Sequence, residues 1–339
     1  MKALALVSDS LPESQPATTM KAIVQKEYGG PDKLELTDVP TPELDDDGVL
    51  VRVRAASLNA LDWRVMRGHP YFVRMSEGWR GPSPIRGIDL AGVVVAVGKN
   101  VTQFEPGDEV FGERGGALAE YLVGTEDRFT HKPENLTFEE AAAVPCAALT
   151  ALQGLRDKAQ LKPGQKVLIN GAGGGVGTFA VQIAKWLGAE VTAVCGPDKV
   201  DTVRSLGADR VIDYTREDFT KTGDRYDVVY DIGGNRSLRR CRRILTPTGT
   251  LVFVGMPTFR FVKPMLRVVR GTLRARFSEQ KALLYMTQHS QDDLIVMKEL
   301  LEAGTVKPVV DRAYPLSGAA EAIRYVEQNR AKGKVVITI

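Results

Sequence analysis

The sequence predicts an α/β protein that combines a compact, strongly bent β domain with a doubly wound parallel sheet. From Met20 to about Phe129, short apolar runs alternate with turns rich in Pro, Gly and Asp, as β-strands do. From about Thr137 onward, short apolar runs alternate with helical segments, which is the pattern of βαβ units. A glycine-rich turn at residues 171–177 lies where the first strand of this second part meets its helix.

The composition is that of an ordinary globular protein with two domains. The chain has 339 residues, of which 43% are hydrophobic and 26% are charged. A net charge of +3 is too small to indicate nucleic acid as a partner. The cysteines, Cys146, Cys195 and Cys241, lie far apart without CxxC spacing, so we expect no disulfide framework and a reducing cytoplasm.

The N-terminal residues do not match the fold pattern. Residues 1–19 carry one early lysine and an ALALV run that is too short for a secretory signal. We expect a disordered extension, an alternative start or a weak targeting segment, with the fold beginning at Met20. No stretch of the chain approaches the roughly 18 consecutive apolar residues of a membrane-spanning helix, so we expect no integral membrane association.

The expected elements follow this division of the chain. The first part has strands at Val49–Ser57, Asp89–Gly98 and Gly107–Glu113. The second part has helices at Val176–Leu187 and near Lys199–Leu206. Its strands are expected at Lys166–Asn170, Glu190–Cys195, Arg210–Tyr214, Asp227–Gly234 and Thr250–Gly255. The C-terminal residues add a helix and a last strand, which we expect to return to the first domain.

The glycine-rich turn predicts a dinucleotide site. Without Cβ atoms, its backbone N–H groups can approach a pyrophosphate at the positive end of the following helix. The literal G-x-G-x-x-G spacing fails, whereas GxxGxxG holds, and a glycine run alone equally fits a flexible loop. The preceding strand and the following helix, which Gly188 ends, favour dinucleotide binding. The expected cofactor residues of the turn are Gly171, Gly174, Gly175, Val176 and Gly177.

The end of the second strand bears on the choice between NADPH and NADH. An acidic residue there would accept hydrogen bonds from the ribose and repel a 2′-phosphate. The sequence instead has Cys195 and Gly196, with Lys199 nearby and Tyr214 closing the next strand. This favours NADPH over NADH. Asp198 is the residue that argues for NADH, and Lys199 alternatively only starts a solvated helix.

Several motifs in one order give the chain a family resemblance. These are AASLNALDWRVMRG, GIDLAGVV, GDEVFG, VPCAALTALQGL, VLINGAGGGVG, LGAD-RVIDY, YDIGG and the closing GKVVI. From Met20 to Ile339 the chain resembles a medium-chain dehydrogenase/reductase of the quinone oxidoreductase (zeta-crystallin-like) branch. The resemblance implies a GroES-like catalytic domain at 20–145 and 305–339 and a Rossmann domain at 146–304, with the active site between them. It also implies a homodimer through edge strands near Thr250–Gly255.

The resemblance also shows where a zinc site would lie. Asn59 stands in place of the first cysteine ligand and Ile88 in place of the histidine, while Cys146 falls near the remaining ligand. The four-cysteine loop of a structural zinc is missing after Phe111. We therefore expect no metal. Three histidines lack ligand spacing and are interpreted as surface or loop residues, namely His69, His131 and His289.

The resemblance assigns catalytic roles to three residues. Asn59 and Asp62 match the family's asparagine and aspartate at the base of the cleft, with turn and helix-capping roles as the alternative. Tyr71 lies in a loop that could roof the pocket and donate a proton, or form only pocket wall. Thr150 matches the threonine beside the nicotinamide. The other expected cofactor residues are Gly233, Phe253, Val254 and Gly255, with the backbone of the last three near the carboxamide.

We therefore expect an NADPH-dependent, zinc-independent reductase that transfers hydride to a quinone or an α,β-unsaturated carbonyl. Hydrogen-bond donors can stabilise the oxyanion of such a substrate without a metal. The alternatives are an alcohol/ketone oxidoreductase and a non-enzymic NADPH-binding protein. A basic helical pattern between Arg260 and Arg276 is expected to be a solvated helix face, and contact with acidic lipid is its alternative.

Overall fold

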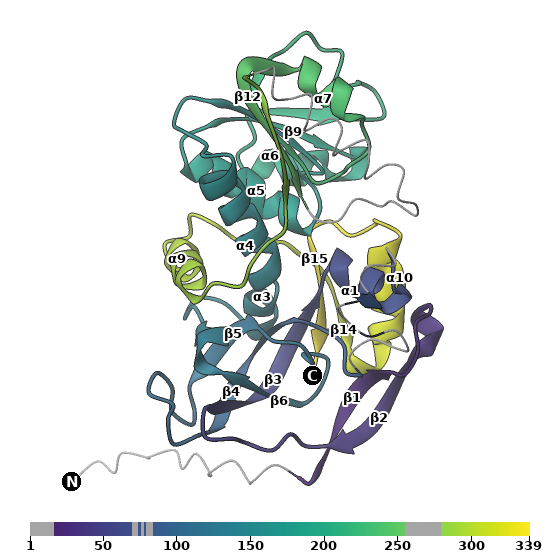
Figure 1. Cartoon of the computed structure of the whole chain (residues 1–339), viewed down its shortest axis with the longest axis vertical. Coiled ribbons are helices and arrows are strands. Elements are labelled where there is room, and N and C mark those ends of the chain that lie inside the picture. The colour runs from purple at the N-terminus through teal and green to yellow at the C-terminus, as the bar shows by residue number, and fades with distance from the viewer. Residues whose placement is uncertain (1–16, 70–73, 76–77, 79–83, 255–278) are drawn as a thin grey trace, which may run out of the picture.

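The computed structural model describes residues 17–69, 74–75, 78, 84–254 and 279–339. Their strands form a two-stranded, a six-stranded and a seven-stranded sheet. Figure 1 shows the six-stranded sheet with its helices in one half of the molecule and the other strands in the opposite half. Tyr71, Gly255, residues 1–16 and the basic segment from Arg260 to Arg276 lie outside the described residues.

The six-stranded sheet is parallel and doubly wound, as the sequence predicts. Its strand order is β10-β9-β8-β11-β12-β13, so the order reverses between β8 and β11. Ligands of such sheets bind outside the carboxyl ends of the strands at this reversal. The strands are β8 (Lys166–Asn170), β9 (Glu190–Cys195), β10 (Arg210–Asp213), β11 (Tyr226–Asp231), β12 (Leu245–Val254) and β13 (Lys281–Tyr285).

The apolar sequence of β8 explains why both faces of this sheet are covered. Val167 and Ile169 belong to the cluster that includes the helix α5 (Gly175–Trp186). Leu168 points to the other face and belongs to a separate cluster with Phe219. All three strand residues are fully buried, as expected for a parallel strand between two helical layers. The smaller helices α6 (Val200–Ser205) and α7 (Leu238–Arg243) contact β10 and β12, respectively.

The seven-stranded sheet contains the C-terminal strand. Its order is β14-β15-β3-β4-β5-β7, with β6 also paired to β3. β15 pairs antiparallel with β3, so the last strand returns to the first part of the chain as expected. The strands are β3 (Gly48–Leu58), β4 (Asp89–Val97), β5 (Glu109–Glu113), β6 (Tyr121–Thr125), β7 (Phe129–His131), β14 (Val310–Pro315) and β15 (Lys334–Thr338). A separate antiparallel pair consists of β1 (Thr19–Gln25) and β2 (Leu34–Pro40).

Helices join the two larger sheets. In Figure 1 α3 and α4 run between them, and α9 lies beside α4. The Tyr230 hydroxyl on β11 donates to the Thr150 carbonyl at 2.7 Å and fixes α4 to the parallel sheet. No helix in the described ranges has the length and apolar character needed to cross a bilayer. The remaining helices are α1 (Ala60–Arg67), α3 (Phe138–Ala142), α4 (Pro145–Leu152), the π-helix η3 (Gln153–Lys158), α9 (Gln291–Glu302) and α10 (Ala319–Glu327).

Most expected elements are confirmed, and the differences lie at their ends. β8 and β9 have the predicted bounds. The strand expected to continue to Gly234 ends at Asp231, because the chain turns there and Gly234 adopts a φ of 58°. The helix expected near Lys199 begins with a 3-10 turn at Pro197–Lys199 and continues as α6.

Two glycines of the 171–177 turn differ in the space around them, which allows a matched test. A Cβ on Gly177 would lie 2.2 Å from the Gly171 carbonyl oxygen, whereas a Cβ on Gly174 would lie 3.6 Å from it. We expect Gly177→Ala to lower the free energy of unfolding by about 1–3 kcal/mol through overpacking. Gly174→Ala should leave it nearly unchanged. Urea denaturation of both variants checks this, and equal stabilities would contradict it.

Candidate active site

A cavity of about 630 Å³ lies at the carboxyl ends of the parallel strands and extends to the last strand of the other sheet. Its volume falls in the range of about 300–1,000 Å³ that is typical of ligand sites. It collects most of the cofactor residues expected from the sequence. These are Gly171, Gly174, Gly175, Val176, Gly196, Lys199, Tyr214 and Gly233, together with Asn59.

The backbone around this cavity fits a dinucleotide. Gly174 is the N-cap of α5, so the first free N–H groups of that helix face the turn. Gly171 adopts a φ of 95°, a conformation that favours glycine. Gly177 does not line the cavity, but its close approach to the turn lets α5 pack against it. The cradle therefore has the shape and the helix polarity that a pyrophosphate requires.

Lys199 spans the cavity at the end of the second strand. Its side chain passes close to the backbone of Gly173. A Cβ added to Gly173 would lie only 2.6 Å from the Lys199 Cδ. Its ammonium donates to the carbonyls of Ala331 at 2.6 Å and Asn329 at 3.4 Å. Burial lowers the pKa of this amine. Arg330 lines the same cavity from the turn before β15, and the sequence analysis missed it.

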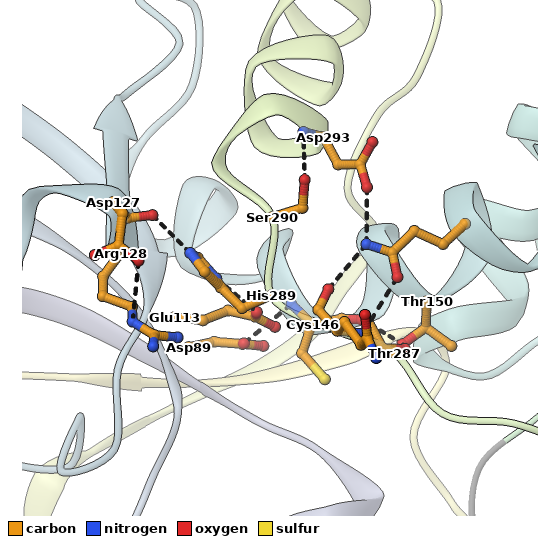
Figure 2. Close-up of polar contacts among 12 residues, drawn as sticks. Asp89, Glu113, Asp127, Arg128, Cys146, Thr150, Thr287, His289, Ser290 and Asp293 are labelled. Carbon is orange, nitrogen blue, oxygen red and sulfur yellow. Dashed lines mark hydrogen bonds and ion pairs between the residues drawn. The ribbon is translucent and has the colours of Figure 1, made fainter. Parts of the chain in front are cut away.

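Three other expected cofactor residues, Thr150, Phe253 and Val254, do not line the 630 Å³ cavity. The Thr150 hydroxyl donates to the Cys146 carbonyl at 2.6 Å and contacts the Thr287 hydroxyl, as Figure 2 shows. Phe253 and Val254 end β12, and both side chains pack against core clusters. These two residues stand at the carboxyl end of β12, which is an inner strand of the parallel sheet.

A buried lysine organises the base of the cleft. Lys334, the first residue of β15, donates to Asn59 Oδ1 at 2.6 Å and to Asp89 Oδ2 at 3.1 Å. The Lys334 and Asp89 side chains are 2% and 0% exposed. Asn59 Nδ2 in turn donates to Asp89 Oδ2 at 2.9 Å. The closing GKVVI motif by itself indicates no role for its lysine, because the partners of Lys334 lie far away in the chain.

Asp62 has both the capping geometry and the position expected of a cleft residue. Its Oδ2 accepts a hydrogen bond from the Asn59 backbone N–H at 2.6 Å, which fixes the start of α1. Its Oδ1 is buried and has no hydrogen-bond partner among the described residues. Burial raises the pKa of this carboxyl to about 6. A structural role at the helix start and a chemical role in the cleft are therefore compatible.

A second cavity of about 350 Å³ adjoins this network and is lined by charged residues. Asp62 and Glu113 contribute carboxyl groups to its wall. The cationic side chains of the wall are Arg86, Arg114 and Arg128, and the imidazole of His289 lies beside Glu113 in the same wall. A small planar substrate would fit this volume, and negative charge that develops on it would face several cations.

Glu113 and His289 are functional candidates that the sequence analysis missed. His289 lies in the loop between β13 and α9, as expected for a loop histidine, but its side chain is only 15% exposed. Its Nδ1 lies 3.1 Å from Glu113 Oε2, as Figure 2 shows. Glu113 pairs in register with Asp89 across β5 and β4, which places two carboxylates opposite each other. The sequence signal that could have identified Glu113 is its position as the acidic last residue of the predicted strand Gly107–Glu113.

The same residues include a possible metal-binding arrangement. Ligand atoms of Asp89, Glu113 and Cys146 lie within 4.8 Å of one another. However, Asp89 Oδ2 already accepts hydrogen bonds from Ser57, Asn59 and Lys334, and Oδ1 accepts one from the Cys146 N–H. Burial raises the pKa of the Cys146 thiol, whereas zinc binds the thiolate. This donor set fits zinc poorly, and we assign no metal to it.

Comparisons with known proteins agree with this architecture. Residues 45–134 match the alcohol dehydrogenase GroES-like domain, and residues 206–337 match a family described as zinc-binding dehydrogenase. A 2-methylene-furan-3-one reductase from Solanum lycopersicum is 35% identical, with 94% of this chain and 79% of the relative covered. A chloroplastic NADPH-dependent alkenal/one oxidoreductase from Arabidopsis thaliana is 34% identical with the same coverage. The solved structure of a quinone oxidoreductase from Coxiella burnetii has a TM-score of 0.85 and 31% identity, covering 95% of this chain and 99% of that one.

The GroES-like sheet, the doubly wound sheet and the cavity between them define a dinucleotide-dependent oxidoreductase. The chain belongs to the medium-chain dehydrogenase/reductase superfamily, in the branch of quinone and alkenal/one oxidoreductases. It is thus an NAD(P)H-dependent oxidoreductase of the quinone/enone reductase family.

The Lys334 ion pair gives a stability prediction with a matched control. Lys334→Met leaves the Asp89 carboxylate buried without its cation, so we expect a loss of about 3–5 kcal/mol in the free energy of unfolding. Lys332→Met is the control, because Lys332 is 45% exposed and its ammonium lies 3.9 Å from Asp198. Its effect should stay within about 0.5 kcal/mol. Chemical denaturation measures both variants, and equal effects would contradict a structural role of the buried pair.

Proposed function

We propose that the protein transfers hydride from NADPH, without zinc, to a quinone or an α,β-unsaturated carbonyl compound. The observation that carries this proposal is the cleft itself. In zinc members of the superfamily, metal ligands occupy the positions that Asn59 and Ile88 hold in this chain. The ammonium of Lys334 here donates a hydrogen bond to the Asp89 carboxylate. Conjugated substrates suit such a cleft, because their charge develops on an oxygen several bonds from the carbon that takes the hydride.

The residues of the chain supply binding and charge stabilisation in this proposal. Bound NADPH supplies the hydride, and the 171–177 turn with the start of α5 would hold its pyrophosphate. Asn59 uses one amide hydrogen on Asp89 and can donate the other to a developing oxyanion. The arginines of the 350 Å³ cavity add positive potential to its wall. Asp62 keeps Asn59 in place through the backbone hydrogen bond.

Four other roles of site residues are parts of this proposal. Thr150 would lie beside the nicotinamide, and the backbone at Phe253 and Val254 would hold the carboxamide together with Gly255. Tyr71, which lies outside the described residues, would be a proton donor, as the sequence suggests. Gly233, whose N–H donates to the Asn170 carbonyl at 3.1 Å, would face the cofactor from the end of β11.

The compartment and the assembly of the protein are also parts of this proposal. All three cysteines are free thiols, which suits a reducing compartment such as the cytoplasm. The Arabidopsis relative is named as chloroplastic, so the family includes members of other compartments. The sequence places a homodimer at edge strands near Thr250–Gly255, but this placement is wrong, because β12 lies between β11 and β13. A homodimer would instead use β13, which is the last strand of the described part of this sheet.

The two alternatives make different demands on the site. Reduction of a simple ketone requires strong polarisation of the carbon that receives the hydride, which a zinc ion supplies in other members. A non-enzymic NADPH-binding protein would need only the glycine turn. The buried charges of the second cavity favour catalysis, because polar groups buried without a role would only destabilise the fold.

The cofactor preference predicts a selective effect of Lys199. If Lys199 and Tyr214 contact the 2′-phosphate, Lys199→Ala should weaken NADPH binding by about 1.5–3 kcal/mol and leave NADH binding nearly unchanged. NADH serves as the internal control, because the variant also loses the contacts of Lys199 with Ala331 and Asn329. Calorimetry with both cofactors measures the effect. Equal affinity of the native protein for NADPH and NADH would contradict the assignment of Lys199 and Tyr214 to the 2′-phosphate. Asp198 would then be the candidate ligand of the ribose.

The reaction itself is tested by following labelled hydride. With deuterated NADPH and a test enone, we expect deuterium on the β-carbon and an intact carbonyl group. Asn59→Ala should lower kcat by about 10²–10³-fold with a smaller change in KM, since the donor acts on the developing oxyanion. Asn100→Ala is the control, because that side chain contacts Asp47 at the exposed surface.

Two results would contradict the proposed function. Deuterium on a carbinol carbon, with an allylic alcohol as product, would identify an alcohol/ketone enzyme. Stoichiometric zinc that is lost together with activity on dialysis against a strong chelator would show that the metal is required. We expect dialysis to leave turnover and melting temperature unchanged.

A further inference from the structure

Glu113 and His289 form an acid–base pair in the wall of the 350 Å³ cavity. Glu113 ends β5 and is 8% exposed, while His289 approaches it from the loop before α9. His289 Nδ1 lies 3.1 Å from Glu113 Oε2, and Nε2 lies 2.7 Å from the Asp127 carbonyl oxygen. Figure 2 shows the imidazole held between these two partners.

These contacts determine how many protons the pair carries. A backbone carbonyl only accepts hydrogen bonds, so His289 Nε2 must carry a hydrogen. A second hydrogen must then lie between Nδ1 and Glu113 Oε2, either on the imidazole or on the carboxyl group. The pair therefore holds one transferable proton in either form.

The surroundings keep this proton on the pair. Burial raises the pKa of Glu113, and nearby Asp89 raises it further, while His289 and Lys334 oppose the shift. The hydrogen bond to Glu113 raises the pKa of His289, against the effects of burial and of Arg128. The nearby Cys146 thiol stays protonated, because burial raises its pKa. Loss of the proton would leave Glu113 as a second carboxylate opposite Asp89.

The proposed function creates a need for such a proton. Addition of hydride to the β-carbon of an enone moves the electron pair of the C=C bond toward the carbonyl oxygen and gives an enolate. The product forms only when the α-carbon receives a proton. A hydroquinone anion, by contrast, takes its proton on oxygen, which exchanges freely with water.

We propose that Glu113, paired with His289, is the catalytic acid that protonates the α-carbon of the enolate. This inference rests on the proposed function. The bond from the transferred hydrogen to Glu113 or His289 breaks, and a C–H bond forms at the α-carbon with the enolate electron pair. The pair is left as a Glu113 carboxylate beside the unprotonated Nδ1 of neutral His289, whose Nε2 keeps its hydrogen on the Asp127 carbonyl, and it regains a proton from water.

Asp62 is the competing acid on the same cavity. Its raised pKa of about 6 and its buried Oδ1 would also allow it to hold a proton. However, Asp62 is 2% exposed, and within the described part of the chain its carboxyl group accepts a hydrogen bond from the Asn59 backbone and has no titratable partner there. Glu113 has an imidazole partner that is itself part of the cavity wall, which provides a route for proton recovery.

The test uses an enone with a methyl group on the α-carbon, NADPH and deuterated water. The native protein should place deuterium on the α-carbon in a single configuration. Glu113→Gln and His289→Gln should release the enolate to solvent, so the product becomes a mixture of both configurations. Enone turnover should fall by about 10²-fold or more, with little change for a quinone acceptor. Glu109→Gln, an exposed acid on the same strand, is the control and should behave like the native protein.

Two further measurements separate chemistry from folding. Calorimetry with NADPH confirms that each variant still binds the cofactor. Nitrogen NMR of the protein without cofactor should show His289 with its hydrogen on Nε2, and an unprotonated Nε2 at neutral pH would overturn the proton count.

The possible outcomes can be told apart. An unchanged product configuration and an unchanged enone rate in both variants would overturn the assignment. The same holds if Asp62→Asn, and not Glu113→Gln, randomises the configuration. If the native protein gives no β-carbon deuteration with labelled NADPH, the proposed function fails and the inference fails with it.

Discussion

The contact of the Lys334 ammonium with Asn59 and Asp89 is the interaction on which the rest of the site depends. The cleft buries three carboxyl groups, those of Asp62, Asp89 and Glu113. Buried charges are tolerated only when they are paired or hydrogen-bonded, and Lys334 provides the cation at Asp89. Removing this cation would leave the base of the cleft with an uncompensated negative charge.

Lys334 also connects the two halves of the molecule. Its backbone N–H donates to the Val309 carbonyl, and a Cβ on Gly175 would lie 2.9 Å from its Cδ. The residue before it, Gly333, donates to the Gly173 carbonyl at 3.2 Å. One residue of the GroES-like sheet thus touches the start of α5 and the charged network together. Asn59 and Lys334 line the cofactor cavity, and Asp62, which accepts a hydrogen bond from the Asn59 backbone N–H, lines the smaller charged cavity.

The sequence predicted those features that local patterns encode and missed those that depend on long-range pairing. The glycine turn, the parallel strands and the cavity positions of Gly196 and Tyr214 follow from strand ends and turn residues. Lys334 meets Asp89 across 245 residues of sequence, and Glu113 faces Asp89 only through the β4–β5 register. His289 was correctly expected in a loop, but its burial against Glu113 has no local signal.

The central claim is that the Lys334–Asp89 pair acts as a unit that stabilises the cleft. A double-mutant cycle of Lys334→Met and Asp89→Asn, with the free energy of unfolding as the measured quantity, tests this most directly. We expect the double variant to lose less stability than the sum of the two single losses, with an interaction energy of about 1–3 kcal/mol. Additive losses, within about 0.5 kcal/mol, would show that the two side chains stabilise the protein independently and would contradict the account.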